Sequence, residues 1–121
     1  MKYMLLVHHD EKSFRQRPEA ERQGMLQESV RLAQQLHASG HYLGAAPLHP
    51  SEETTCVRVR DGRPVVIDGP FAETREQLGG YFLVDVKDLD EAIAIAARIP
   101  GARIGTVEVR RVTEVVGLPG D

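Results

Sequence analysis

A polar loop is the strongest candidate for a chemical site in this sequence. It runs from Asp68 to Tyr81 and reads Asp-Gly-Pro-Phe-Ala-Glu-Thr-Arg-Glu-Gln-Leu-Gly-Gly-Tyr. Asp68 precedes a Gly-Pro pair that stiffens the backbone and can aim its carboxylate, and Glu73 follows a few residues later. Two carboxylates that share a pocket acquire different pKa values, which suits them to acid–base chemistry. We therefore predict Asp68 and Glu73 as catalytic residues, and Thr74, Arg75 and Tyr81 as binding groups for an anionic or phenolic substrate.

The same loop also has a purely structural interpretation. In that case Asp68 caps a turn, Gly69 supplies a positive φ angle, and Phe71 fills a place in the core. Against it, long rigid polar loops in small domains are commonly functional. Both interpretations stay open at this point.

Histidines at the end of the first predicted strand are a second candidate. Strand alternation points His8 and His9 to opposite sides, so the two rings do not easily share a metal ion. Because imidazole titrates near neutral pH, we predict His8 as a general base facing a pocket. A solvated strand end is the alternative. His37 and His41 have metal-ligand spacing, but Gly40 should break the helix between them, and we predict no metal site.

A predicted hairpin carries the remaining reactive side chains. Arg58 and Arg60 alternate with Val57 and Val59, so one hairpin face presents guanidinium groups that can bind an anion. We include Arg58 among the substrate-binding residues, although charges that keep an exposed strand soluble explain it equally well. Cys56 is the only cysteine, which excludes an intramolecular disulfide and a cysteine-based zinc cluster, and we expect an inert thiol. No cofactor motif is present, and no cofactor is predicted.

The composition is that of an ordinary globular protein. Of its 121 residues, 41% are hydrophobic and 27% are charged, which fits one domain. The formal net charge of −3 disfavours direct nucleic-acid binding, because a surface that follows phosphates is usually basic. No stretch approaches the ~20 apolar residues of a membrane span, and the N-terminus lacks a signal-peptide pattern. We therefore expect a cytoplasmic protein that does not contact the membrane.

Hydrophobic periodicity divides the chain into strands and helices. Alternation indicates strands, apolar spacings of three and four indicate helices, and Asp61-Gly62 is a favoured two-residue hairpin turn. The expected elements are a strand at 3–8, a helix at 18–38, a strand at 42–48, a hairpin of 55–60 and 63–67, a strand at 81–86, a helix at 88–99 and a strand at 104–112. The buried stripe of the first helix is expected to contain Met25, Leu26, Val30, Ala33 and Leu36.

Without the hairpin, the order of elements is βαββαβ, the pattern of a ferredoxin-like sandwich in the α+β class. Two helices should cover one face of the sheet. The other face carries Met4 and Leu6 and would be bare in a monomer, and such an apolar surface commonly meets a partner. We therefore predict one domain at residues 1–116 with an inserted hairpin, a homodimer packed sheet against sheet, and a flexible tail at 117–121.

Several segments together resemble one known family. The block Asp68–Tyr81 is similar to the signature of DGPF proteins, and the segments Met1–Val7, Val57–Gly62 and Val107–Arg110 match the same family. The sequence thus resembles the DGPF branch of the YCII-related family over nearly its whole length. The resemblance implies a dimeric α/β-barrel of the ferredoxin-like type, in agreement with the periodicity.

The resemblance also raises expectations about activity and active-site residues. The wider YCII-related group includes a dehydrochlorinase that acts on a chlorinated hydroxyhydroquinone, and a His–Asp pair is proposed as the active site of some members. This sequence departs from that pattern, because the middle of its first helix reads Gln27-Glu28-Ser29-Val30 and no histidine follows until His37. The His–Asp mechanism therefore does not carry over.

Two functions from different classes are predicted. In the first, the protein binds or acts on a small molecule by acid–base chemistry at a pocket associated with the dimer, lyase-like by analogy alone. In the alternative, it is a non-enzymatic interaction or regulatory module linked to an alternative sigma-factor pathway, since DGPF members are often encoded beside such factors. The face with Arg58 and Arg60 would then meet a protein partner.

Overall fold

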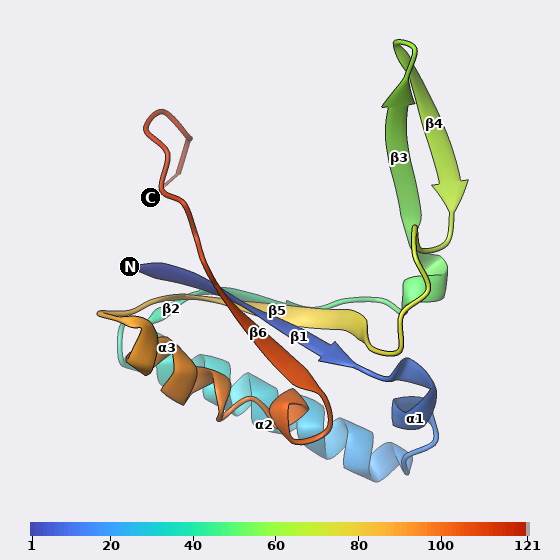
Figure 1. Ribbon diagram of the computed structural model, residues 1–121. Helices are drawn as coiled ribbons and strands as arrows, with labels where there is room; N and C mark the ends of the chain where they lie inside the picture. The colour runs from blue at the N-terminus through green and yellow to red at the C-terminus, as the bar shows by residue number, and fades with distance from the viewer. Residues whose placement is uncertain (121) are drawn as a thin grey trace.

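The computed structural model describes residues 1–120, which form a four-stranded antiparallel sheet, helices on one face of it, and a separate two-stranded hairpin (Figure 1). The strand order in the larger sheet is β2-β5-β1-β6. In chain order the elements are β1 (Lys2–His9), α1 (Glu11–Arg15), α2 (Glu19–Ala38), β2 (Tyr42–Pro47), η1 (Ser51–Glu53), β3 (Thr55–Arg60), β4 (Arg63–Asp68), β5 (Gln77–Asp85), α3 (Leu89–Ala96), η2 (Pro100–Arg103) and β6 (Thr106–Arg111).

This arrangement confirms the predicted ferredoxin-like α+β fold. Alternation in β1 turns Tyr3 and Leu5 toward the helices, and their partners across the sheet, Val84 and Phe82, are buried beside them. The helices complete the core with Leu32, Leu36, Ala92, Ile95 and Ala96, and Ile99 joins it from the turn before η2. Burial of these apolar surfaces is the main force that holds the two layers together.

One added helix and two boundaries differ from the prediction. The short helix α1 follows β1 because Asp10 caps it, with Oδ1 accepting a hydrogen bond from the Ser13 amide at 3.2 Å. Strand β5 begins at Gln77, so the predicted loop up to residue 80 is shorter than expected. Helix α3 ends at Ala96, and the chain continues to Pro100, where η2 begins.

Only part of the predicted stripe of α2 is buried. Leu36 is 1% exposed, but Leu26 and Val30 are 51% and 48% exposed, so the prediction was wrong for these two side chains. The strands opposite this end of the helix carry small residues on their helix-facing side, among them Ala45 and Gly80. Small side chains leave space between helix and sheet, and the apolar face of α2 borders that space instead of filling it.

The hairpin of β3 and β4 is confirmed. Its turn has Asp61 at φ 52° and Gly62 at φ 73°, the pair of positive angles that a tight two-residue turn requires. The hairpin projects away from the rest of the molecule, on the side of the sheet opposite α2 and α3 (Figure 1).

The face of the four-stranded sheet opposite α2 and α3 is called here the open face. It carries Met4 and Leu6, as the alternation predicted, and also Leu83, and these side chains are only partly buried. Residues 112–120, the C-terminal segment, rise on the same side at the end of the sheet away from the hairpin (Figure 1). Asp121, the last residue of the predicted tail, lies outside the described residues. The homodimer and the flexibility of the tail stay predictions.

Candidate functional site

A cavity of about 1030 Å³ lies between α2 and the sheet; it is called here the helix-side cavity. Its apolar wall comes from both layers and includes Val7, Met25, Leu26, Val30 and Phe82. Its titratable groups are His9, Glu11, Arg15, Glu19, Arg22, His37, Tyr42 and His49. A cavity whose wall is largely apolar, with polar groups at defined places, is the usual form of a site for a small molecule.

A smaller cleft of about 250 Å³, called here the polar cleft, shares His9, Phe14 and Ile104 with the helix-side cavity. The polar cleft is also lined by Asp10, Ser13, Arg17, Arg75 and Glu76. Arg17 is paired with Glu21, Nη1 to Oε1, at 2.6 Å. Within residues 1–120, the guanidinium of Arg75 makes no hydrogen bond or ion pair. It is therefore available to an anionic group of a ligand.

His9 lies where the cavity and the polar cleft meet. Its ring packs against Phe14, with centroids 4.9 Å apart and planes tilted by 59°. Burial lowers the pKa of His9 below its ordinary value, and the nearby carboxylates Glu11, Asp10 and Glu76, which act in the opposite sense, do not offset it. A half-buried imidazole that is neutral at pH 7 can accept a proton or a hydrogen bond from a ligand.

The rim of the cavity is held by hydrogen bonds around α1. The Glu11 carboxylate accepts hydrogen bonds from the Ser51 amide at 3.0 and 3.1 Å, which ties η1 to α1. The Glu11 amide donates to Gln77 Oε1 at 3.0 Å, which ties α1 to β5. Arg15 reaches Glu52 at 2.9 Å. These contacts join three segments that are distant in the sequence at the entrance of one cavity.

Two of the residues predicted from the sequence border these spaces. Arg75 lines the polar cleft and Tyr81 borders the helix-side cavity. Tyr81 pairs with Leu6 across the sheet, a register that places it among the residues of the open face. Of these two residues, Arg75 lies in the same cleft as His9, and Tyr81 does not.

The other predicted residues line neither space. Asp68 ends β4 and Glu73 lies in the following loop, and both are exposed. Thr74 donates a hydrogen bond from Oγ1 to the Glu76 carbonyl at 2.6 Å, a contact internal to the loop. Arg58 is exposed on the hairpin.

The loop shows parts of its structural interpretation as well. Gly69 has φ 89°, as that interpretation requires. Phe71, in contrast, is 75% exposed and does not fill the core.

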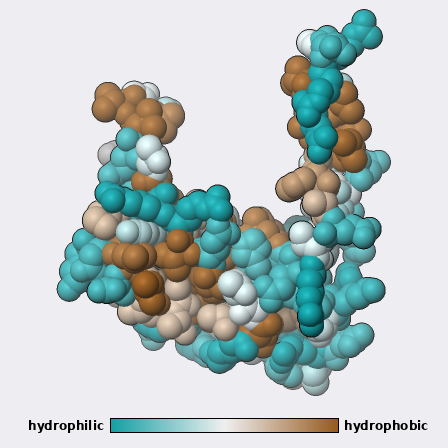
Figure 2. All heavy atoms as spheres, in the orientation of Figure 1, coloured by the Kyte–Doolittle hydropathy of each residue, from teal (hydrophilic) through white to brown (hydrophobic). Residues whose placement is uncertain are grey.

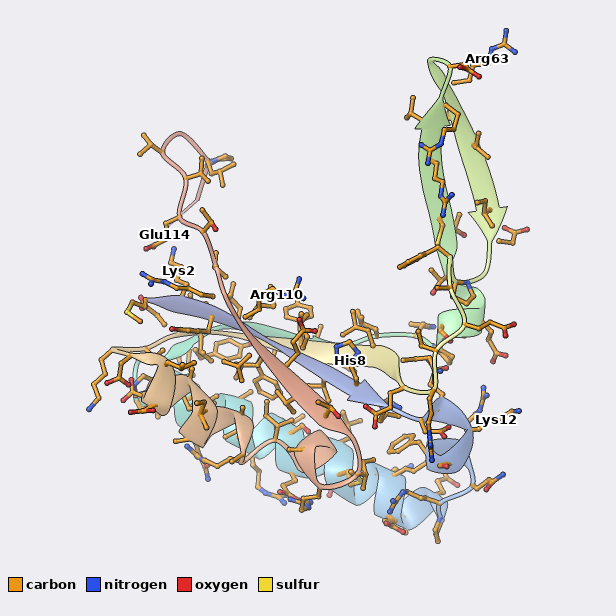
Figure 3. All side chains as sticks on the ribbon, viewed as in Figure 1. Lys2, His8, Lys12, Arg63, Arg110 and Glu114 are labelled. Carbon is orange, nitrogen blue, oxygen red and sulfur yellow. The ribbon has the colours of Figure 1, made fainter. Side chains whose placement is uncertain are left out.

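His8 lies on the open face, opposite to His9. Its Nε2 is 3.2 Å from Oε1 of Glu108, and Arg110 donates to the other oxygen of the same carboxylate. Figure 3 shows Arg110 on the side of the sheet away from the helices. Burial alone would raise the pKa of Glu108, but the hydrogen bonds from His8 and Arg110 outweigh it and hold that pKa below the ordinary value.

Sequence reasoning missed His9 and Arg17 as site residues. The signal for His9 was present, because a strand with Tyr3, Leu5 and Val7 on its buried face places His9 on that face too. Nothing in the spacing of Arg17 indicated that α1 would bring it to the same cleft. Groups of three or more His, Cys, Asp or Glu side chains arranged to hold a metal ion do not occur among residues 1–120.

The strand order, with both long helices on one face, defines the class of this protein as a ferredoxin-like α+β domain. A family model for the YCII-related domain matches residues 1–116. The chain is 32% identical over 112 residues to the Uncharacterized protein R00369 of Rhizobium meliloti (strain 1021), across 91% of this chain and 90% of that protein. The protein belongs to the YCII-related family. None of the helices in residues 1–120 has the length and apolar character needed to cross a bilayer.

Proposed function

We propose that this protein binds a small molecule with an apolar body and an anionic group, and that His9 exchanges a proton with it. The observation that carries the proposal is the position of His9 between the helix-side cavity and the polar cleft. The apolar wall suits the body of the ligand, and the unpaired guanidinium of Arg75 suits the anion. Binding would therefore orient the ligand with its polar end at His9.

Acid–base chemistry is the reaction class that these groups support. A neutral His9 can remove a proton from a carbon beside an electron-withdrawing group and become imidazolium. If a leaving group then departs as its anion from the adjacent carbon, the result is an elimination. This lyase-like reaction extends the proposal by analogy to the family. The proposal also includes membership of the DGPF branch, which the resemblance of the block Asp68–Tyr81 supports.

The proposal includes a homodimer. The open face carries partly buried Met4, Leu6 and Leu83, and an apolar sheet face of this kind is stabilised when a second sheet covers it. Such a dimer would also enclose His8 beside Glu108. Asp68, His8 and Glu73 keep their predicted catalytic role as a separate hypothesis tested in the same assay.

The experiment is a thermal-shift screen with benzoate and 4-chlorobenzoate as anionic probes and benzamide as a neutral probe of the same shape. The carboxylates should raise Tm by a few degrees at saturation, as binding to the folded state alone requires, and benzamide should raise it less. His9→Gln and Arg75→Gln should lose the shift.

His8→Gln is the matched control, because it changes the neighbouring histidine on the opposite face of β1. If His8→Gln keeps the shift in Tm and His9→Gln loses it, the result supports ligand binding at the helix-side cavity. Loss in Asp68→Ala, Glu73→Ala or His8→Gln instead places the site at the sequence-predicted residues. No shift with any probe contradicts the proposal.

The alternative from the sequence, an interaction module of a sigma-factor pathway, has one supporting observation in the protruding hairpin with its exposed Arg58 and Arg60. A purified sigma factor that binds the protein stoichiometrically, together with no bound small anion, would favour that alternative.

A further inference from the structure

The helix-side cavity is long in one direction. Its lining residues on α2 extend from Glu19 to His37, which at ~1.5 Å per residue is about 27 Å of helix axis. Helix α2 runs along the sheet from α1 to the start of β2 (Figure 1), so the cavity follows the helix over nearly its whole length. Its volume of about 1030 Å³ is at the upper end of the ~300–1,000 Å³ range of small-molecule sites. A molecule of the size of benzoate therefore fills only one end of it.

The middle of the cavity is apolar on both walls. The wall from the helix contains Met25, Leu26, Val30 and Ala33, and the opposite wall includes Val7, Ala45, Phe82 and Ile99. Between Arg22 and His37, no residue of α2 that lines the cavity carries a full charge. Leu26 and Val30 are 51% and 48% exposed, so the cavity is open to solvent along one side. Over α1 and the first half of α2, the surface seen in Figure 2 is mostly hydrophilic, so these apolar side chains are not part of that outer surface.

Guanidinium groups gather at the end of the cavity beside α1, called here the α1 end. The arginines that line the cavity or the polar cleft are Arg15, Arg17, Arg22 and Arg75, and they belong to α1, the start of α2 and the loop before β5. Within residues 1–120, Arg75 is the one among them without a hydrogen bond or ion pair. At the other end, the rings of His37 and Tyr42 meet edge to face, with centroids 6.2 Å apart. An elongated anionic ligand would therefore place its charge at the α1 end and its apolar part along α2.

Most carboxylates at the α1 end are already bound by the chain. Asp10 caps α1, Glu11 accepts hydrogen bonds from the Ser51 amide, and Glu19 accepts one from Gln23 at 3.2 Å. Glu76 remains, and it lines the polar cleft together with Arg75. Its charge reduces the attraction of the cleft for an anion, which makes its replacement a useful test.

We propose that the ligand is a long-chain carboxylate, with its unbranched alkyl chain along α2 and its carboxylate at Arg75 and His9. This inference rests on the proposed function and names the class of ligand for the same site. A zigzag chain of ~1.5 Å carbon–carbon bonds advances about 1.3 Å per methylene, so the cavity has the length for a chain of roughly 16–18 carbons. The row of apolar side chains on α2 then covers the chain along one side, and the strands cover it along the other.

A second copy of the chain is the other occupant that an apolar groove can take. A polypeptide segment that entered the cavity would bring backbone N–H and C=O groups between two apolar walls, where they lose their water. An alkyl chain has no such groups and loses nothing by entering. The alkyl chain is therefore the occupant that the walls favour.

Titration calorimetry with hexanoate, octanoate, decanoate and dodecanoate, below the concentrations at which they form micelles, tests the ligand class. One carboxylate should bind per chain, and Kd should fall about two- to fourfold for each added methylene, because each one leaves water for an apolar wall. Decan-1-ol should bind more weakly than decanoate, and Arg75→Gln should remove that difference.

The outcomes separate this inference from the proposed function. A Kd that no longer falls beyond hexanoate overturns the long-chain ligand, whereas a shift in Tm with benzoate that depends on His9 still supports the proposed function. Equal binding of decanoate and decan-1-ol overturns the position of the carboxylate at Arg75. If neither benzoate nor any alkyl carboxylate binds, both proposals are wrong.

Two exposed leucines supply a matched pair of substitutions. Leu26 lines the cavity and is 51% exposed, and Leu89, on α3, is 49% exposed and does not line it. Leu26→Glu should weaken the binding of decanoate tenfold or more, and Leu89→Glu should leave it unchanged. Equal effects contradict the placement of the chain. If light scattering shows that Leu26→Glu dissociates a dimer while the dependence on chain length persists, a second copy covers the apolar row and the inference is wrong.

Glu76→Gln tests the position of the carboxylate from the opposite direction. Removal of this negative charge should strengthen the binding of decanoate a few fold and leave that of decan-1-ol unchanged. An equal gain for both ligands would show that the carboxylate does not lie at the polar cleft.

Discussion

The ring of His9 lies directly against the backbone of Gly79. A Cβ built on Gly79 would be 2.7 Å from Nδ1 of His9, and closer still to the adjoining ring carbon. The close approach arises at an irregularity of the sheet, where Val7 pairs with Gly80 but His8 pairs with Leu78. Such bulges commonly occur beside functional sites, because they redirect a side chain.

Gly79→Ala should therefore displace the His9 ring and disturb its packing on Phe14. We expect a loss of about 1–3 kcal/mol in the free energy of unfolding, the usual range for an overpacked site, and a changed chemical shift of the His9 ring protons. Gly24→Ala is the control, since no atom lies within 4 Å of its added Cβ. Within a helix that change should stabilise by up to about 1 kcal/mol. Unfolding in urea and NMR measure both variants; an undisturbed His9 in Gly79→Ala would refute the expected contact.

The lowered pKa of His9 predicts a pH dependence of stability. As the pH falls below about 6.5, the unfolded chain takes up a proton on this histidine before the folded chain does. The contribution of His9 to stability is therefore fully present above pH ~6.5 and is lost as the pH falls through the lower pKa of the folded state. His9→Gln should remove this loss, so the difference in unfolding free energy between variant and wild type should change between pH 7.5 and 5.

Phe14→Ala tests the cause of the lowered pKa without replacing His9 itself. Without the ring at 4.9 Å, His9 is more hydrated and its pKa should rise toward the ordinary value. An NMR titration of the ring protons measures it. A titration midpoint of His9 at or above 6.5 in the wild type would contradict the cause that we assign.

The two ends of α2 should respond differently to truncation. Leu36 is 1% exposed in the core, so Leu36→Ala should cost about 2–5 kcal/mol. Leu26 is 51% exposed and borders the helix-side cavity, so Leu26→Ala should cost less than about 1 kcal/mol. Equal losses in urea unfolding would mean that the N-terminal half of α2 packs on the sheet and that the cavity is closed in solution.

This contrast also shows how far the sequence predicts the molecule. The periods of two and 3.6 indicate β1, α2 and the order of elements, because a buried face leaves a regular apolar pattern. The same pattern groups Leu26 with Leu36, although only one of them is in the core. Periodicity reports which side of a helix is apolar, whereas the small residues of distant strands decide whether that side is packed or borders a cavity.

The site was predicted less completely than the fold. Arg75 was named from its loop and does line the polar cleft. Its position beside His9 depends on contacts between α1, β1 and the loop before β5, which no local spacing encodes. His8 was predicted to face a pocket in place of His9, since alternation separates the two side chains but does not say which side of the strand faces a cavity.

The last prediction concerns Glu108 and the stability of the fold at acid pH. The hydrogen bonds from His8 and Arg110 lower the pKa of Glu108 in spite of its partial burial. Because the folded pKa is lowered, the stabilisation is fully present above the ordinary carboxyl pKa of about 4.5 and is lost as the pH falls through the folded value. Glu108→Gln should therefore reduce stability at pH 7 and flatten its decline below pH ~4.5.

Glu28 is the matched comparison, because its pKa is also lowered, here by a hydrogen bond from Arg103 with distances of 2.9 and 2.8 Å. Glu28→Gln should likewise reduce the decline in stability below pH ~4.5. The two carboxylates lie on different surfaces of the protein, because Glu28 belongs to α2 and Glu108 to the open face. Under the proposed homodimer, Glu108→Gln should shift the monomer–dimer equilibrium measured by light scattering, and Glu28→Gln should leave it unchanged. A shift with Glu28→Gln alone would place the dimer contact on the helices instead of the open face.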